Sequence, residues 1–136
     1  ISKKFAYRLN LYGGITIGEY LPEFYEYRLG GIFEQNLVNF KTFSGFYFAQ
    51  LNTNNVIYAS NDIQYKISKS FFLSGNFTFA NLSDDISFED AVKLNYSSLG
   101  ATIGYKSPFG QVKLNFAHSL KNNQKGIFSV ILGHWF

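Results

Sequence analysis

The sequence contains no cysteine and no methionine, and only two of its 136 residues are proline. Without cysteine the chain can form neither a disulfide framework nor a thiolate metal site. No apolar run approaches the roughly 20 residues that a membrane-spanning helix needs, which excludes a helical membrane protein. The basic residues are scattered and the formal net charge is only +3, so the sequence offers no surface suited to nucleic acid.

A charged-then-apolar leader is also missing, since the chain opens on Ile1-Ser2-Lys3-Lys4. Either a signal peptide has been removed, or the chain is the C-terminal part of a longer protein. We expect the second.

Aromatic residues, by contrast, make up 20% of the chain, and residues 126–136 show the clearest pattern. Their apolar side chains recur at every second position, with one histidine intruding. About ten residues with a period of two, ending on an aromatic, are typical of the closing strand of an outer-membrane β-barrel. The alternative is a buried strand of a soluble β-sandwich. In the barrel interpretation, the signal for the barrel-assembly machinery consists of Phe128, Val130, Leu132, His134 and Phe136.

Six further stretches alternate in the same way, and the apolar face of each is free of Asp, Glu, Lys and Arg. A Lys or Arg on the lipid side at the bilayer midplane costs about 2–4 kcal/mol, which explains such an exclusion. The pattern predicts an all-β protein, an antiparallel transmembrane β-barrel with about seven or eight strands in this chain. In the third stretch Asn61 is the one exception to the alternation. The apolar faces consist, in chain order, of Phe5, Tyr7, Leu9 and Leu11; Tyr25, Tyr27 and Leu29; Ile57, Ala59, Ile63, Tyr65 and Ile67; Phe71, Leu73, Phe77 and Phe79; Leu99, Ala101, Ile103 and Tyr105; and Val112, Leu114, Phe116 and His118.

The opposite faces are rich in Ser, Asn, Gly, Thr and Gln, with isolated charges of both signs. Such a composition suits a crowded polar lumen in which opposite charges pair. The charged residues that we expect to face this lumen are Arg8, Glu26, Arg28, Asp62, Lys66 and Lys113.

The connections alternate between short and long, as they do in outer-membrane barrels, where periplasmic turns are short and external loops long. Residues 69–70 and 107–110 are tight turns, whereas 82–97 and 120–126 are longer and 32–55 is very long. Seven strands cannot close a bacterial barrel, which has an even number of eight or more. We therefore expect either that residues 44–52 form an eighth strand, or that the remaining barrel strands or a second copy close the sheet.

Three segments carry a resemblance to a known family. The strand Phe24-Tyr25-Glu26-Tyr27-Arg28-Leu29-Gly30-Gly31, the hairpin from Leu99 to Asn115 with its Ser-Pro-Phe-Gly turn, and the stretch from Phe128 to Phe136 occur in the order found in the bacterial surface antigen family. That family includes barrel-assembly and two-partner-secretion proteins. The resemblance implies that the long loop at about 32–55 folds inward into the barrel.

The tip of that loop departs from the family pattern. The family has an Arg-Gly-aromatic tip, whereas this chain has Phe43-Ser44-Gly45-Phe46, with serine in place of the arginine. The family's acidic partner is also missing, because Phe77-Thr78-Phe79-Ala80-Asn81 contains no carboxylate. Losing both together is coherent, since a charge buried in a lumen needs its counter-charge. The departure argues against a protein-insertion or secretion role that depends on this pair.

Residues 33–46, followed by Ala80-Asn81-Leu82, are instead similar to the C-terminal barrels of patatin-like phospholipases from Bacteroidetes-type bacteria. In that group a secreted lipase domain precedes a barrel of sixteen strands. The resemblance implies that residues 1–136 are one C-terminal outer-membrane β-barrel segment, which anchors such a lipase in the bacterial outer membrane. The implied partners are outer-membrane lipid and lipopolysaccharide, the assembly machinery and the remaining strands.

No catalytic or metal-binding motif accompanies this pattern. The sequence has no Gly-x-Ser-x-Gly elbow for a serine hydrolase. His118 and His134 are too far apart in a hairpin to share a metal, and the acidic cluster at 84–90 matches no calcium loop. We therefore expect no enzyme activity and no cofactor in this chain. Two alternatives remain open: a self-contained eight-stranded barrel acting as a narrow pore or adhesin, and a soluble β-sandwich that binds a ligand.

Overall fold

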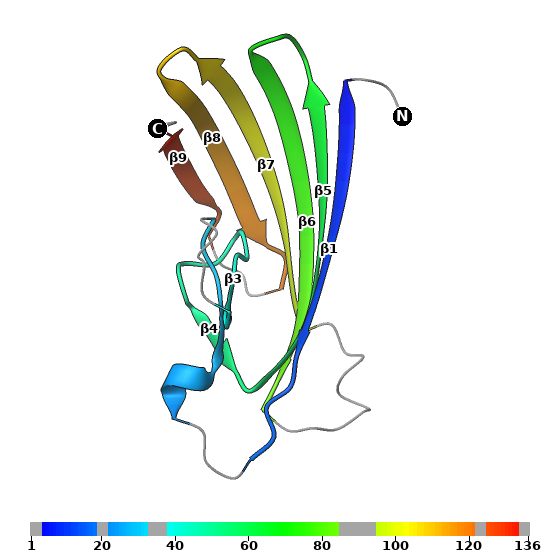
Figure 1. Ribbon diagram of the computed structural model, residues 1–136, viewed down its shortest axis with the longest axis vertical. Helices are drawn as coiled ribbons and strands as arrows, with labels where there is room; N and C mark the ends of the chain where they lie inside the picture. The colour runs from blue at the N-terminus through cyan, green and yellow to red at the C-terminus, as the bar shows by residue number, and fades with distance from the viewer. Residues whose placement is uncertain (1–3, 19–21, 33–37, 85–94, 122–124, 134–136) are drawn as a thin grey trace.

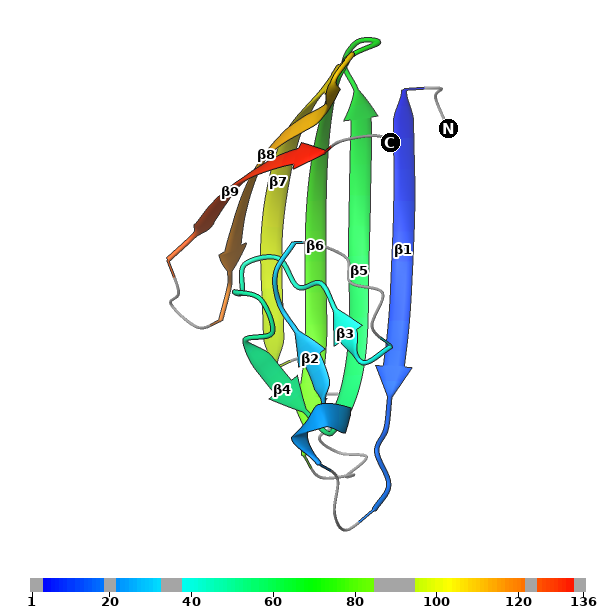
Figure 2. The same ribbon diagram turned by 60° about the vertical axis from the view of Figure 1, so that its left-hand side comes forward.

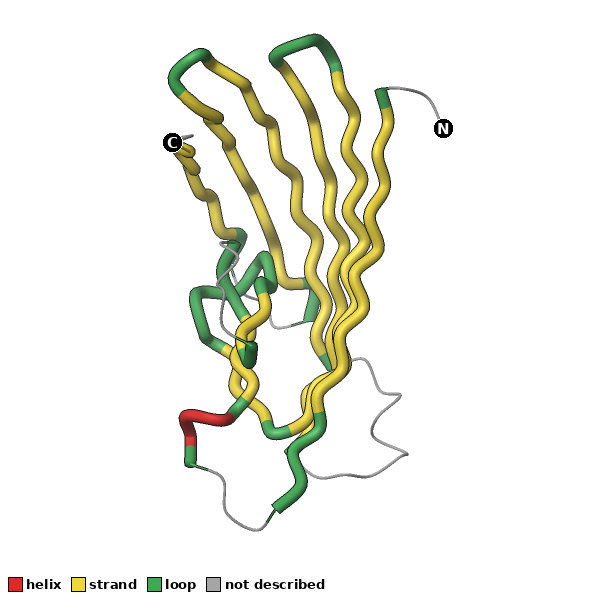
Figure 3. Tube along the Cα trace, in the orientation of Figure 1, coloured by secondary structure: helices red, strands yellow, loops and turns green. Residues whose placement is uncertain are grey.

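The computed structural model describes residues 4–18, 22–32, 38–84, 95–121 and 125–133. Its main feature is a six-stranded antiparallel sheet, here called the wall, with the strand order β1-β5-β6-β7-β8-β9 (Figure 1). The wall strands run side by side along the long axis of the molecule, and β9 is the shortest of them (Figure 3). Their bounds are β1 Phe5–Gly14, β5 Asn55–Lys66, β6 Phe71–Ser83, β7 Tyr96–Ser107, β8 Gly110–Ser119 and β9 Ile127–Gly133.

The period of two in the sequence arises because successive side chains of a strand point to opposite faces of the sheet. One face of the wall carries the apolar set, and these side chains are exposed: Leu9 is 50% exposed, Leu11 73% and Val130 54%. The other face carries the polar set and lines a cavity. The expected assignment of the two faces is confirmed, and with it the all-β antiparallel fold class.

The connections between wall strands also follow the expected pattern. β5 joins β6, and β7 joins β8, through tight turns at one end, which we call the tight-turn end. The links at the opposite end are longer, and the longest is the segment 15–54 between β1 and β5, here called the inner loop. In Figure 2 the wall curves, and the short strands of the inner loop lie on its concave side.

The described part of the inner loop contains one 3-10 turn and a small sheet of its own. The turn is η1 (Glu23–Tyr25), and the sheet has the order β3-β2-β4. β2 (Tyr27–Leu29) pairs in parallel with β3 (Phe40–Lys41) and antiparallel with β4 (Leu51–Thr53). No helix of the described residues is long and apolar enough to span a membrane.

The prediction that residues 25–29 form a wall strand is wrong. β1 pairs directly with β5 along its whole length, from Phe5 opposite Tyr65 to Gly14 opposite Val56, so nothing lies between them. β2 ends at Leu29 because Gly30 and Gly31 follow with φ values of +138° and +74°, where a side chain would be strained. The apolar position Leu29 faces a protein core, being 1% exposed, and not lipid.

The eighth wall strand expected at 44–52 is not formed either. Residues 44–50 are turns and irregular backbone, and the strand that follows, Leu51–Thr53, belongs to the small sheet. The wall within the described residues therefore has six strands and two unpaired edges, β1 and β9. The alternative of a self-contained eight-stranded barrel built in this way is wrong.

The hydrophobic core lies between the inner loop and the inner face of the wall. It is made of Leu29, Phe43 and Phe46 from the loop and of Val56, Tyr58 and Ala80 from β5 and β6. A soluble sandwich would bury the large apolar face of the wall in such a core. Here that face is exposed, and the core lies on the opposite face, under the inner loop.

Candidate functional site

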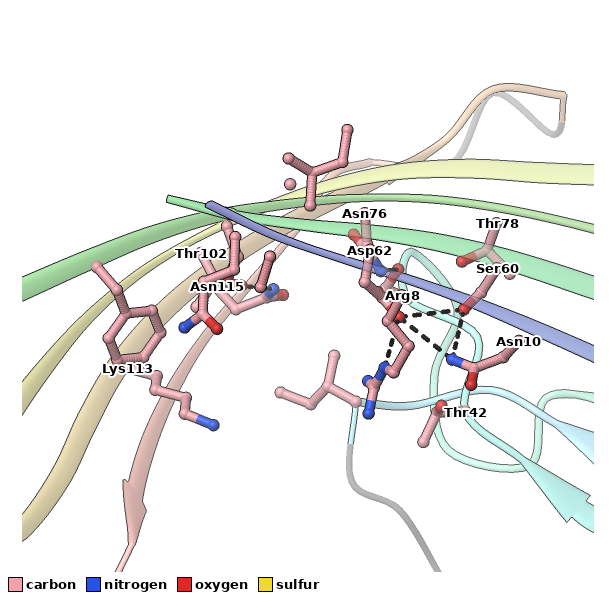
Figure 4. Close-up of a pocket in the computed structure, with 18 of the residues that line it drawn as sticks. Arg8, Asn10, Thr42, Ser60, Asp62, Asn76, Thr78, Thr102, Lys113 and Asn115 are labelled. Atoms are coloured by element: carbon pink, nitrogen blue, oxygen red, sulfur yellow. Dashed lines mark hydrogen bonds and ion pairs between the residues drawn. The ribbon is translucent and has the colours of Figure 1, made fainter. Parts of the chain in front are cut away.

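The candidate site is the polar inner face of the wall, together with the inner-loop tip that rests on it. A cavity of about 830 Å³ opens between the tip and the tight-turn end. Figure 4 shows its polar side chains projecting from β1, β5 and β6 on one side and from β7 and β8 on the other. The lining residues used below are Arg8, Asn10, Ser44, Ser60, Asp62, Asn76, Thr102, Lys113 and Asn115.

Asp62 is the centre of a hydrogen-bonded cluster on the β1–β5 side of the cavity. The Arg8 Nε lies 3.2 Å from Asp62 Oδ2, as expected for residues directly opposite each other in the register. Asn10 Nδ2 and Ser60 Oγ each donate to the same carboxylate oxygen at 3.3 Å. The Arg8 side chain is 64% exposed and that of Asp62 28%, so water screens the pair and it contributes little to stability.

The inner-loop tip contacts the wall through a neutral hydrogen bond. Asn76 Nδ2, on β6, donates to Ser44 Oγ at 2.7 Å, and Ser44 is only 5% exposed. The half-buried Asn76 and the buried Ser44 satisfy each other, and removing Asn76 would leave Ser44 unpaired at a cost of about 1–3 kcal/mol. Serine and asparagine therefore hold the tip without any buried charge.

Gly45 brings the backbone of the tip against β8. Its φ is +89°, and a Cβ at this position would lie 2.9 Å from the carbonyl carbon of His118 and 3.0 Å from the Ser119 nitrogen. Both are backbone atoms that cannot rotate away. Only glycine fits this approach.

Two phenylalanines of the tip anchor it in the core. Phe43 and Phe46 are 0% and 1% exposed, and their ring centroids lie 5.0 Å apart. Phe43 also meets the Tyr58 ring at 6.1 Å, and Phe46 meets Tyr96 at 5.8 Å. The Tyr58 hydroxyl donates to the Thr42 carbonyl at 2.9 Å, so the wall holds both sides of the tip.

Residues 1–136 match the family model of the OMP85 superfamily. The chain belongs to this superfamily. Searches of curated proteins and of solved structures found no match. OMP85 membership agrees with an exposed apolar wall around a polar interior and identifies the chain as an outer-membrane β-barrel segment of the surface-antigen type.

OMP85 membership and the exposed outer face together make the soluble-sandwich interpretation wrong. Soluble monomers rarely expose a contiguous apolar patch larger than about 300–600 Å². Here large apolar side chains of all six wall strands are exposed on the same side. In the outer membrane that face contacts hydrocarbon, so its exposure has no free-energy cost.

The residues expected to face the lumen of this OMP85 barrel fall into two groups. Arg8, Asp62 and Lys113 line the cavity, and Lys66 lies near it at the tight-turn end. Glu26 and Arg28 belong to the inner loop and not to the wall. Four of the six expected lumen residues therefore lie on the wall, and two lie in the inner loop.

Pairing of these charges is more limited than the sequence suggested. Among the described residues, the one ion pair that forms is that of Arg8 with Asp62, and no carboxylate lies within ion-pair distance of Lys66 or Lys113. Arg28 donates from Nη2 to the Glu23 carbonyl at 3.3 Å, while its buried Nε has no partner.

Three residues of the expected assembly signal lie on the outer face of β9. Phe128, Val130 and Leu132 are 64%, 54% and 73% exposed. His134 and Phe136 lie outside the described residues. An apolar ridge along an OMP85 edge strand is available to a partner, and its role as a signal stays a prediction.

Sequence reasoning missed two functional features. It treated Asn61 as an exception on the lipid side, but the Tyr7 hydroxyl donates to Asn61 Oδ1 at 2.6 Å and so satisfies it. It also did not select Asn76, which holds the tip. The available signal for the Asn61 contact was a polar residue on an apolar face, one strand away from a tyrosine. No signal in the sequence pointed to Asn76.

No group of three or more potential metal ligands occurs in the part of the chain that the structure describes. Of the acidic cluster at 84–90, only Asp84 falls within it.

Proposed function

We propose that this chain is the wall and inner loop of a bacterial outer-membrane barrel that anchors a secreted patatin-like lipase, and that the chain itself performs no catalysis. The observation that carries the anchoring role is the pairing of an exposed apolar outer face with an inner face that the loop occupies. An anchor needs a stable attachment to hydrocarbon and does not need an open pore.

The occupied interior supports an anchor more than a wide channel. Phe43, Phe46 and Leu29 fill the half of the wall that lies toward the long connections. The cavity of about 830 Å³ lies beside this core, and Thr42, Ser44 and Tyr58 are among the residues that line it. The loop therefore fills part of the interior next to the wall, which an anchor tolerates better than a wide channel does.

The neutral tip supports the lipase assignment. The resemblance to patatin-like barrels was based on residues 33–46 and 80–82, and the same region holds the Ser44–Asn76 hydrogen bond. A hydrogen bond between neutral groups keeps the loop docked without the counter-charge that a buried arginine requires. This arrangement suits a loop that stays in place.

Further strands are required in this proposal. An open sheet edge in hydrocarbon leaves backbone N–H and C=O groups unpaired at several kcal/mol each. The wall has an even number of strands, so its edges β1 and β9 run in opposite directions. An even number of additional antiparallel strands can therefore join β1 to β9, and we propose that the rest of a sixteen-stranded barrel supplies them.

The remaining partners follow from the surfaces. The exposed side chains of the outer face would contact outer-membrane lipid and, on the long-connection side, lipopolysaccharide. The apolar ridge of β9 would be read by the barrel-assembly machinery. In the proposal, the residues that form this signal are Phe128, Val130, Leu132, His134 and Phe136.

The test uses the full-length protein that contains this chain, produced in its bacterium or in a related outer-membrane host. We expect phospholipase activity to sediment with the outer membrane. Val130→Lys puts a charge on the lipid side and should release that activity from the membrane fraction. Ser129→Lys, its neighbour on the inner face, should leave the activity membrane-bound.

The outcomes separate the two parts of the proposal. A full-length protein that inserts but hydrolyses no phospholipid would refute the lipase and leave the anchor. If Val130→Lys and Ser129→Lys leave the same share of the activity in the membrane fraction, the outer face does not anchor the protein.

A further inference from the structure

The cavity on the inner face of the wall carries unequal charge on its two sides. On the β1–β5 side, Arg8 and Asp62 form an ion pair with 3.2 Å between Nε and Oδ2. On the β7–β8 side, Lys106 and Lys113 line the same cavity. Neither lysine has an ion-pair partner in the part of the chain that the structure describes. The β7–β8 side therefore has two positive charges that the described residues leave uncompensated.

Both lysines project from the same face of the sheet. Lys106 pairs with Gln111 and Lys113 pairs with Gly104, so the two lysines are diagonal neighbours on adjacent antiparallel strands. Residues in this relation lie about 7–8 Å apart, which is within reach of long side chains. In Figure 4 the Lys113 amine and the Arg8 guanidinium project to the same side of the wall. One anion on the inner face can therefore contact both lysine amines without crossing the sheet.

An aromatic ring forms the floor of the cavity beside the lysines. A Cβ at Gly104 would overlap the ring of Phe72, so this ring lies over the glycine backbone, next to the positions of Lys106 and Lys113. Phe72 is 6% exposed and lines the cavity. An apolar floor lowers the local dielectric constant, which strengthens the attraction between an amine and an anion.

Neutral hydrogen-bonding groups lie around the two lysines. Ser74, Thr102 and Asn115 all line the cavity. Asn115 is 7% exposed, and its Nδ2 donates to Thr102 Oγ1 at 2.7 Å. The Asn115 Oδ1 is buried and has no hydrogen-bond partner, which is rare for a buried polar atom. A ligand hydroxyl that enters beside Lys113 would supply the missing donor.

The chemistry of the lining restricts the ligand. Lysine suits phosphate as a compact point charge. A simple anion would supply no donor to the amide and hydroxyl oxygens, whereas sugar hydroxyls both donate and accept. The volume of about 830 Å³ falls within the range of about 300–1,000 Å³ that is usual for small-molecule sites. Because the cavity lies on the inner face, its ligand is water-soluble and is not the headgroup of a membrane lipid.

From these observations we propose that the inner face of the wall binds a sugar phosphate. The phosphate lies between Lys106 and Lys113, and the sugar hydroxyls bond to Ser74, Thr102 and Asn115. The cavity opens toward the tight-turn end, and the tight turns of outer-membrane barrels lie on the periplasmic side. The ligand therefore enters from the periplasm.

The test measures binding to the folded full-length protein in neutral detergent by isothermal titration calorimetry. The probes are glucose 6-phosphate, glucose and inorganic phosphate at one fixed salt concentration. Lys106→Gln combined with Lys113→Gln should weaken glucose 6-phosphate binding about 10- to 100-fold, since a charge-assisted hydrogen bond contributes about tenfold and less where water screens it. Lys113→Arg keeps the charge and should retain binding. Lys121→Gln combined with Lys125→Gln removes the same charge at the long-connection end and should leave binding unchanged.

Each outcome supports or overturns the site. Tighter binding of glucose 6-phosphate than of glucose and inorganic phosphate, lost only in the Lys106 and Lys113 double variant, supports it. Equal loss in both double variants overturns it. No binding to the unmodified protein overturns it as well, and would mean that strands outside this chain neutralise the two lysines. If inorganic phosphate binds as tightly as glucose 6-phosphate, the sugar assignment is wrong. Circular dichroism checks that each variant is folded, and no outcome bears on the membrane attachment of the protein.

Discussion

Replacing Gly45 by alanine tests whether the inner loop is held against β8 by close backbone contact. The new Cβ would meet the carbonyl carbon of His118 at 2.9 Å and the Ser119 nitrogen at 3.0 Å. These backbone atoms belong to β8 residues that pair with Leu99 and Ser98 of β7, so they cannot shift without disturbing the sheet. The loop tip has to move instead.

The expected cost has two parts. Placing an L-residue at a φ of +89° costs roughly 1–2 kcal/mol. Forcing an extra methyl group into a packed contact costs about 1–3 kcal/mol. Together they destabilise the docked loop by about 2–5 kcal/mol, and at one factor of ten per 1.4 kcal/mol the undocked population rises at least about 30-fold.

Hydrogen exchange of residues 38–53 in the folded full-length protein measures this population, because exchange of a docked segment follows its local opening. Gly13→Ala is the matched control. A Cβ at Gly13 meets only the Val56 carbonyl oxygen, at 3.9 Å. We expect this control to exchange at the wild-type rate or more slowly, since alanine restricts the unfolded chain.

A wild-type exchange rate in Gly45→Ala would refute the reasoning, because it would mean that the tip does not contact β8. Rapid exchange of the segment in the unmodified protein would refute it as well. Rapid exchange throughout the wall in Gly45→Ala would instead indicate that the loop supports the whole barrel.

Three further changes test the wall. Ile103→Lys, on the outer face, should destabilise the inserted protein by about 2–4 kcal/mol in a urea titration in lipid, while Ser74→Lys, at a similar depth on the inner face, should cost much less. Tyr7→Phe should cost about 1 kcal/mol by leaving Asn61 unpaired, and adding Asn61→Leu should recover it; a double-mutant cycle without coupling would contradict the 2.6 Å hydrogen bond. Asp62→Asn should change the same unfolding free energy by about 1 kcal/mol or less, since the ion pair is largely screened, and a larger loss would show that the cluster is dry.

The sequence alone predicted which face of each wall strand meets lipid. Leu9 and Leu11 of β1, and Val130 and Leu132 of β9, are exposed on the outer side, as their alternation required. It could do so because hydrocarbon tolerates no formal charge along a whole face, and that exclusion is visible strand by strand. The tight turns followed in the same way from short polar breaks between alternating stretches.

The partner of β1 and the place of β2 could not be read from the sequence. Tyr25, Tyr27 and Leu29 alternate like a wall strand, yet β2 lies inside, and β1 pairs with a strand that starts about forty residues later. An apolar side chain that faces lipid and one that faces a protein core give the same pattern, because both avoid water. Alternation reports that a strand has two different sides and says nothing about what covers them.

The candidate site, too, could be predicted from the sequence only in part. The polar residues of the lumen and the neutral tip Phe43-Ser44-Gly45-Phe46 were visible in the sequence, since their composition sets their chemistry. That Ser44 meets Asn76, and that Gly45 lies against the backbone of β8, was decided only by the tertiary structure. These contacts join residues far apart in the chain, and they exist because the register of the sheet and the curvature of the wall bring them to the same place.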